Sequence, residues 1–139
     1  MKARVKWIEG TRYLGTSGTG HGVVMEASAS DQSVGPSPME MLLLGMGGCT
    51  TYDVVAILKK MRLPVEDVIV ELEADRADSV PKTFTKIHCV FTVVGKNIPL
   101  AKAQEAVKLS GEKYCSASRM LEKTAEITFE TKILEQSPD

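Results

Sequence analysis

The chain has 139 residues, 43% of them hydrophobic and 25% charged, which is close to the averages for ordinary globular proteins. This length predicts a single domain over residues 1–139, with roughly two thirds of the unfolded chain's surface buried on folding. Seventeen basic and eighteen acidic side chains give a formal charge of −1, and the basic ones are scattered singly, which excludes a nucleic-acid partner. No apolar run approaches the roughly 18 residues of a membrane span, and the start of the chain lacks the apolar region of a signal peptide. We therefore expect a cytoplasmic protein with no membrane partner.

The first 26 residues predict an antiparallel meander of three short strands. Val5 and Trp7 alternate with Arg4 and Lys6, a period of two that is typical of a strand with one buried face. Residues 12–14 and 23–25 predict two further strands, separated by a glycine-rich turn at 15–20.

A loop of small and polar residues at 28–37 leads into a predicted helix. Ser37, Pro38 and Glu40 have the spacing of a capping box with proline in the first turn, so a helix should run from Pro38 to about Leu44. Three glycines between residues 45 and 48 then predict a break, since each costs roughly 1 kcal/mol in a helix interior relative to alanine. A second, largely buried helix should run from Cys49 to Met61.

The second half of the chain predicts a hairpin, an amphipathic helix and a last strand. Strands at 65–73 and 84–94 should pair across the 75–82 loop. Residues 99–113 have helical spacing, 114–121 form a turn or short helix, and 125–134 alternate as a strand. The predicted fold class is therefore α+β.

Three cysteines, Cys49, Cys89 and Cys115, are an odd number at wide spacing, which suits neither a disulfide framework nor a zinc site with short ligand pairs. His21 and His88 lie far apart in different kinds of segment, so no metal centre is expected. Cys89 falls on the inward side of its strand, beside other apolar residues, where a small buried side chain packs. No cofactor is predicted.

Cys49 is the first candidate for chemistry. At the start of a helix it would meet free N–H groups and the positive end of the helix dipole, which favour thiolate and lower a pKa that is about 8.5 in free cysteine. Asp53 opposes that effect if it points the same way. A lone cysteine on an apolar helix is otherwise an inert packing residue, and this alternative stays open.

Glu40 is the second candidate. On an unbroken helix, its nine-position separation from Cys49 is about 900° of rotation, which puts the two on opposite faces. The glycine cluster is where the chain can change direction and bring them together. The helix cap alone also explains a glutamate at this position, so both roles remain possible.

The segment Pro36-Ser-Pro-Met-Glu-Met-Leu-Leu-Leu-Gly-Met-Gly-Gly-Cys49 resembles the signature of the OsmC/Ohr family, which comprises proline, glutamate, leucine, small residues and cysteine. Glu112-Lys-Tyr-Cys-Ser-Ala-Ser118 resembles the segment around the family's second cysteine. The order of elements agrees over nearly the whole chain. The alternating Ala-Arg-Val-Lys-Trp start is most similar to the YhfA-like branch of that family.

This resemblance implies an OsmC-like fold, with antiparallel sheets wrapped around central helices in an intertwined homodimer that has two interface sites. In peroxidatic members the first cysteine attacks an organic hydroperoxide, the second captures the resulting sulfenic acid as a disulfide, and a small dithiol reduces it. Cys49, Cys115 and Glu40 would then be the nucleophile, the resolving thiol and the orienting carboxylate.

Two departures from the peroxidatic pattern leave another class of function open. Residues 28–37 contain no arginine, whereas peroxidatic members pair an arginine of this loop with the glutamate. Arg12 and Arg119 are the substitutes the chain offers, and each is otherwise an ordinary exposed cation. Ser116 follows the second cysteine where proline is common. The alternative is a noncatalytic protein that binds a small apolar or thiol-reactive ligand between subunits, or a redox sensor.

Overall fold

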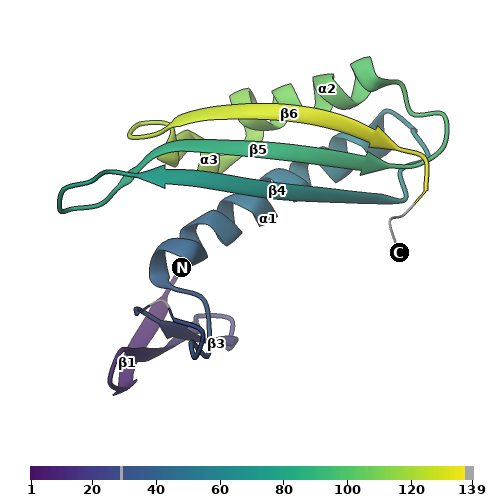
Figure 1. Ribbon diagram of the computed structural model, residues 1–139. Helices are drawn as coiled ribbons and strands as arrows, with labels where there is room; N and C mark the ends of the chain where they lie inside the picture. Colours follow the sequence, from purple (N-terminus) through teal and green to yellow (C-terminus); the bar gives the residue numbers. More distant parts are fainter. Residues whose placement is uncertain (29, 137–139) are drawn as a thin grey trace. The chain divides into compact units, whose positions relative to one another are not determined.

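The computed structural model describes residues 1–28 and 30–136, which form an α+β fold with two three-stranded sheets (Figure 1). Its elements, in chain order, are β1 (Ala3–Glu9), β2 (Arg12–Ser17), β3 (Gly22–Glu26), α1 (Pro38–Lys60), β4 (Asp67–Arg76), β5 (Phe84–Val94), α2 (Leu100–Leu109), the π-helical turn η1 (Ser110–Tyr114), α3 (Ser116–Leu121) and β6 (Glu126–Leu134). The chain gathers into two compact units, Met1–Leu44 and Gly45–Asp139. The expectation of one domain over the whole chain stays a prediction.

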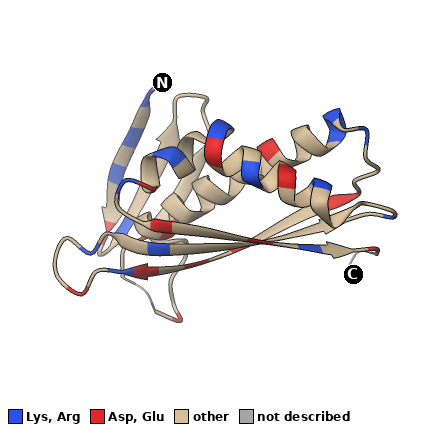
Figure 2. Ribbon diagram, turned by 90° about the horizontal axis from the view of Figure 1, so that it is seen from above, with Lys and Arg blue, Asp and Glu red and all other residues tan. Residues whose placement is uncertain are grey.

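The first unit contains the predicted meander, with β1 antiparallel to β2 and β2 antiparallel to β3. Basic residues alternate along β1, as the bands on this strand in Figure 2 show. The expected burial of its other face is wrong for this chain, because Val5 and Trp7 are 61% and 63% exposed. An alternating pattern predicts which side chains share a face of a strand, but it does not predict whether another part of the protein packs on that face. Ala29, in the expected 28–37 loop, lies outside the described residues.

The second unit is built on the sheet β4-β5-β6. The β4–β5 hairpin is antiparallel, as predicted, and the predicted inward residues of β5 are all at most 1% exposed: Ile87, Cys89, Phe91 and Val93. The expectation of purely antiparallel sheets is wrong, because β6 pairs with β5 in parallel. Parallel strands need a long crossover, and the helical segment from α2 to α3 provides one.

Helix α1 runs without interruption through the glycine cluster, so the predicted break is wrong. At Gly47 an added Cβ would lie 3.0 Å from the Leu72 side chain on β4, so glycine here allows the helix backbone to approach the sheet closely. Met46, Val54 and Leu58 of the same helix are fully buried. Their packing offsets the roughly 1 kcal/mol that each glycine costs in a helix.

By length and composition α1 is also long and apolar enough to cross a membrane, a test that central helices of soluble domains pass as well. Within this chain only 28% of its most apolar 18-residue window is buried. Much of the apolar surface of α1 is therefore at least partly open within the described residues.

The predicted helix over residues 99–113 ends earlier than expected, because α2 passes into the π-helical turn η1 after Leu109. That turn closes with the Cys115 N–H donating to the Ser110 carbonyl at 2.8 Å, and α3 follows immediately. Helix α2 packs against β6 through a face that includes the buried Ala103, Ala106 and Val107.

Candidate functional site

The fold brings the sulfurs of Cys49 and Cys115 together. These two Sγ atoms and a carboxylate oxygen of Asp53 all lie within 4.8 Å of one another. Cys49 and Asp53 are four positions apart on α1 and so share a helix face, while Cys115 lies between η1 and α3. Asp53 points toward the sulfurs, the condition under which its charge opposes a thiolate.

Ser110 joins the two sides of this site. Its hydroxyl donates a hydrogen bond to Asp53 Oδ2 at 3.1 Å, and its carbonyl accepts the Cys115 N–H at 2.8 Å. The residue is fully buried. A π-helical turn frequently marks a functional site, and here it positions both Cys115 and the partner of Asp53. Sequence reasoning missed Ser110, because helical spacing over 99–113 gives no sign of a change from α- to π-helical turns.

Cys115 is the buried member of the pair, at 3% exposure. Its sulfur caps α3 by accepting the Ser118 N–H at 3.3 Å. Burial raises the pKa of Cys115, the side chain and N–H of Ser118 oppose that change, and the neighbouring Cys49 sulfur reinforces it. Cys115 is therefore held as a thiol rather than as a thiolate at neutral pH.

Cys49 is half-buried and lies in the middle of α1, not at a helix start. The expected activation by free N–H groups and the helix dipole is therefore absent, since that effect is confined to the first turn. Because Cys49 is the more accessible sulfur of the pair, an external molecule reaches it first.

Glu40 forms the capping box that its spacing predicts. The Ser37 N–H donates to Glu40 Oε1 at 2.9 Å and the Glu40 N–H donates to Ser37 Oγ at 3.1 Å. The bond from the Ser37 N–H, followed by the Ser37 side chain, lowers the pKa of Glu40. Because α1 is continuous, the bend expected to turn Glu40 toward Cys49 is absent, and the cap accounts for Glu40 within this chain.

Both candidate arginines have acidic partners in the chain. Arg12 Nε donates to Glu26 Oε2 at 2.8 Å, and the Thr11 hydroxyl also bonds this buried carboxylate. The bond from Thr11, followed by that from Arg12, lowers the pKa of Glu26. Arg119 donates to the Glu112 carbonyl at 2.9 Å and pairs with Glu122 at 3.3 Å.

Cys89 is fully buried on β5, as the alternation predicts. Burial, with a smaller contribution from the nearby Cys115, raises the pKa of Cys89 to about 12. The third thiol is therefore close to the pair but is kept protonated and out of contact with solvent.

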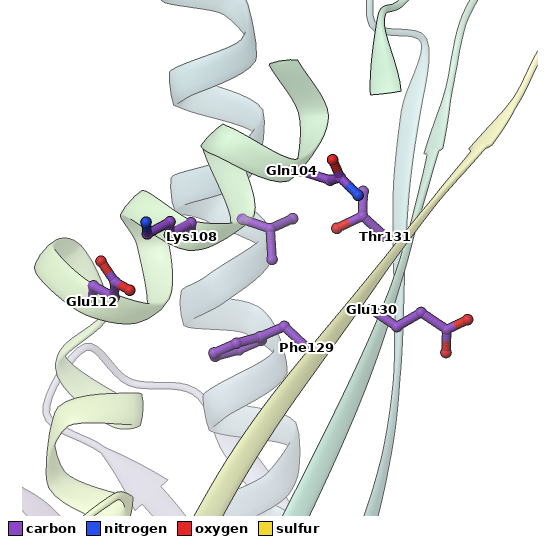
Figure 3. Close-up of a pocket in the computed structure, with 7 residues that line it drawn as sticks. Gln104, Lys108, Glu112, Phe129, Glu130 and Thr131 are labelled. Carbon is purple, nitrogen blue, oxygen red and sulfur yellow. The ribbon is translucent and has the colours of Figure 1, made fainter. Parts of the chain in front are cut away.

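An apolar cleft of about 280 Å³ opens beside the site. Asp53 is one of its lining residues, and the others are Ala56, Ile57, Lys60, Leu109 and Tyr114. A second cleft of about 440 Å³ lies between α2–η1 and β6, and its lining includes Gln104, Lys108, Phe129 and Thr131 (Figure 3). Neither cleft is lined by a cysteine. The first cleft is the one that reaches Asp53, whose carboxylate lies near both sulfurs, so it is the better approach to the site.

Residues 29–130 match the family described as OsmC-like protein. This chain belongs to that family. It is 45% identical over 134 residues to Protein YhfA of Escherichia coli K12, a match that covers 96% of this chain and 98% of that protein. The resemblance to the family and to its YhfA-like branch is thereby confirmed.

Two solved structures share this fold. A hypothetical protein from Aquifex aeolicus VF5 superposes with a TM-score of 0.80 at 30% identity, over 96% of this chain and 97% of that one. The organic hydroperoxide resistance protein OhrB of Bacillus subtilis superposes with a TM-score of 0.70 at 20% identity, over 95% and 98% of the two chains. The second match shows a shared fold.

Proposed function

We propose that this protein reduces organic hydroperoxides, with Cys49 as the nucleophile and Cys115 as the resolving thiol. The observation that supports this proposal is the approach of two sulfurs, remote in sequence, to within 4.8 Å of each other. The more exposed residue, Cys49, is suited to react with the peroxide. The buried Cys115 is suited to remain a thiol until the sulfenic acid forms. The fold shared with the Bacillus subtilis organic hydroperoxide resistance protein supports the same class of reaction.

The reaction consists of three balanced steps. The Cys49 thiolate attacks the terminal oxygen of ROOH, the O–O bond breaks, and the leaving alkoxide takes a proton to form the alcohol. Cys115 then attacks the sulfenic acid on Cys49, forming a disulfide and releasing water. An external dithiol reduces this disulfide by exchange and leaves as its own disulfide. A disulfide bond is about 2.0 Å long, so the second step needs the sulfurs to approach by less than about 3 Å.

We also propose that the working unit is a homodimer. Val5 and Trp7 of β1 are exposed, and only 28% of the apolar window of α1 is buried by the described residues. A second copy would bury these surfaces, as the family resemblance implies. The orienting role of Glu40 belongs to this assembly, because along a single helix Glu40 and Cys49 face opposite ways. A stable monomer in a light-scattering measurement of mass would contradict the dimer.

Peroxide consumption tests the reductase. The reduced protein is mixed with cumene hydroperoxide or hydrogen peroxide, and peroxide loss and free thiols are followed together. Cys49→Ser should abolish peroxide loss, whereas Cys115→Ser should react once and accumulate sulfenic acid because no resolving thiol remains. Cys89→Ala, the matched cysteine control, should consume peroxide as the wild type does. Thiols of the wild type that stay unreacted with both peroxides would contradict the proposal.

A noncatalytic ligand-binding role is the second candidate. Two observations favour it. Arg12 and Arg119, the candidate cations for the thiolate, are bonded to Glu26 and to the Glu112 carbonyl. The Asp53 carboxylate also lies beside the sulfurs, where its charge disfavours a thiolate. The apolar cleft beside Asp53 gives such a ligand a place to bind. A small apolar electrophile that modifies Cys49 in a protein inert to peroxide would support this role. A redox sensor would instead form the disulfide once, without turnover.

A further inference from the structure

Asp53 has no task in the thiol chemistry described above. Its carboxylate is near both sulfurs, and a negative charge there repels a thiolate. Its hydrogen bond from Ser110 explains how it is oriented but not why an anionic group faces a pair of nucleophiles. Three potential ligand atoms, two sulfurs and one carboxylate oxygen, therefore converge on one point.

We propose that Cys49, Asp53 and Cys115 form a binding site for a thiophilic divalent metal ion such as Zn²⁺ or Cd²⁺. In tetrahedral zinc sites Zn–S bonds of about 2.3 Å and Zn–O bonds of about 2.1 Å place neighbouring ligand atoms about 3.5–3.8 Å apart. The three ligand atoms here lie within 4.8 Å of one another, so a contraction of about 1 Å, within reach of side-chain rotation, closes the site.

The negative charge of Asp53 stabilises a bound cation but destabilises a free thiolate on either cysteine. A bound M²⁺ displaces the protons of both thiols, so two protons are released and two thiolates and one carboxylate surround the ion. The carboxylate that disfavours a free thiolate becomes a ligand in this state. The metal thus gives Asp53 a role that peroxide reduction does not.

The surroundings have the features of a supported metal site. Ser110 donates to Asp53 Oδ2 and Ser118 N–H donates to Cys115 Sγ, so two of the three ligands are oriented by second partners. Cys49 and Asp53 are half-buried, and the cleft beside Asp53 leads to solvent. Three protein ligands with an accessible fourth position are typical of reactive zinc sites rather than of closed structural ones.

This proposal departs from the sequence-based expectation of no metal centre, which stays a prediction. That expectation rested on the wide spacing of the cysteines, and it could not include Asp53, whose approach to Cys115 depends on the π-helical turn. The consequence goes beyond the proposed reductase. A metal ion held by Cys49 occupies the sulfur that would attack a peroxide, so metal and peroxide compete for one atom.

Cadmium binding to the full chain tests the site. Reduced, metal-free protein is titrated with Cd²⁺, and the thiolate-to-cadmium charge-transfer absorption is recorded beside equilibrium dialysis. We expect one ion per chain, and loss of that ion in Cys49→Ser and in Cys115→Ser. Asp53→Asn should weaken binding at least about tenfold, and Ser110→Ala should weaken it about 10- to 100-fold, the range for residues that orient a ligand. Cys89→Ala removes the third thiol and should bind as the wild type does.

Several outcomes would overturn the site: no Cd²⁺ bound at one ion per chain, unchanged affinity in Asp53→Asn, or loss of the ion in Cys89→Ala. Should a variant fail to fold, the wild type alone still decides, because Zn²⁺ but not Mg²⁺ must protect Cys49 from alkylation by iodoacetamide. Peroxide consumption is measured separately on metal-free protein. A failed reductase with intact Cd²⁺ binding, or the reverse, therefore tells the two proposals apart.

Discussion

Strands β1 and β5 have the same alternating pattern and opposite surroundings. On β5 the inward residues Ile87 and Phe91 are at most 1% exposed, while on β1 Val5 and Trp7 are more than 60% exposed. β5 is the middle strand of its sheet, whereas β1 lies at the edge of the other (Figure 1). The difference shows that an alternating sequence determines which side chains share a face of the strand. Whether that face is buried depends on other segments of the chain or on another chain.

Removing a large side chain from β5 should have the largest effect on stability. Phe91 is fully buried and packs against the Phe129 ring with 6.1 Å between centroids. Phe91→Ala should lower the free energy of unfolding by about 3–5 kcal/mol, because it removes apolar burial and leaves a cavity. Urea unfolding followed by circular dichroism measures this change. Lys86→Ala, exposed on the same strand, should change stability by less than about 0.5 kcal/mol.

On β1 the same kind of substitution should act on association instead. A second copy that covers Trp7 would bury a side chain worth about 1.5–3 kcal/mol per chain. Trp7→Ala should therefore lower the dimer's association constant and lower the unfolding midpoint at a given protein concentration. Sedimentation at several concentrations measures the association constant, and thermal unfolding measures the midpoint. Arg4→Ala, also on β1, is the control, and an equal effect of the two substitutions would remove the contrast between the strands.

The same contrast between covered and open positions exists within α1. Gly47 faces β4, where an added Cβ would meet the Leu72 side chain at 3.0 Å, while an added Cβ at Gly48 would meet nothing within 4 Å. Gly47→Val should destabilise the protein by about 1–3 kcal/mol through overpacking. Gly48→Ala should stabilise the isolated chain by about 1 kcal/mol, since alanine is the better helix former. Thermal unfolding of both variants measures the difference, and loss of stability in Gly48→Ala would indicate that another chain packs on that face.

The sequence predicted the elements well and their junctions poorly. Alternation and helical spacing located the meander, the β4–β5 hairpin and the inward face that holds Cys89, because those patterns depend on local geometry. The break at Gly45–Gly48 was wrong because helix propensity is outweighed by the tertiary packing at Gly47. The approach of Asp53 and Ser110 to Cys115 was not predictable, because it depends on a π-helical turn that helical spacing does not reveal. The resemblance to the family selected Cys49 and Cys115, and the residues alone did not.

The cap of α1 should give the smallest effect, and one that depends on pH. Ser37→Ala removes the acceptor of the Glu40 N–H and should cost about 1 kcal/mol. Glu40→Gln keeps a side-chain acceptor for the Ser37 N–H but loses the charge, so its cost should be smaller still. Because the folded pKa of Glu40 is lowered from its ordinary 4.5, the carboxylate's contribution is present above that value and is lost as pH falls through the lower folded pKa. The stability difference between wild type and Glu40→Gln in urea should therefore vanish in acid. A difference that persists unchanged at low pH would mean that Glu40 contributes through something other than its charge.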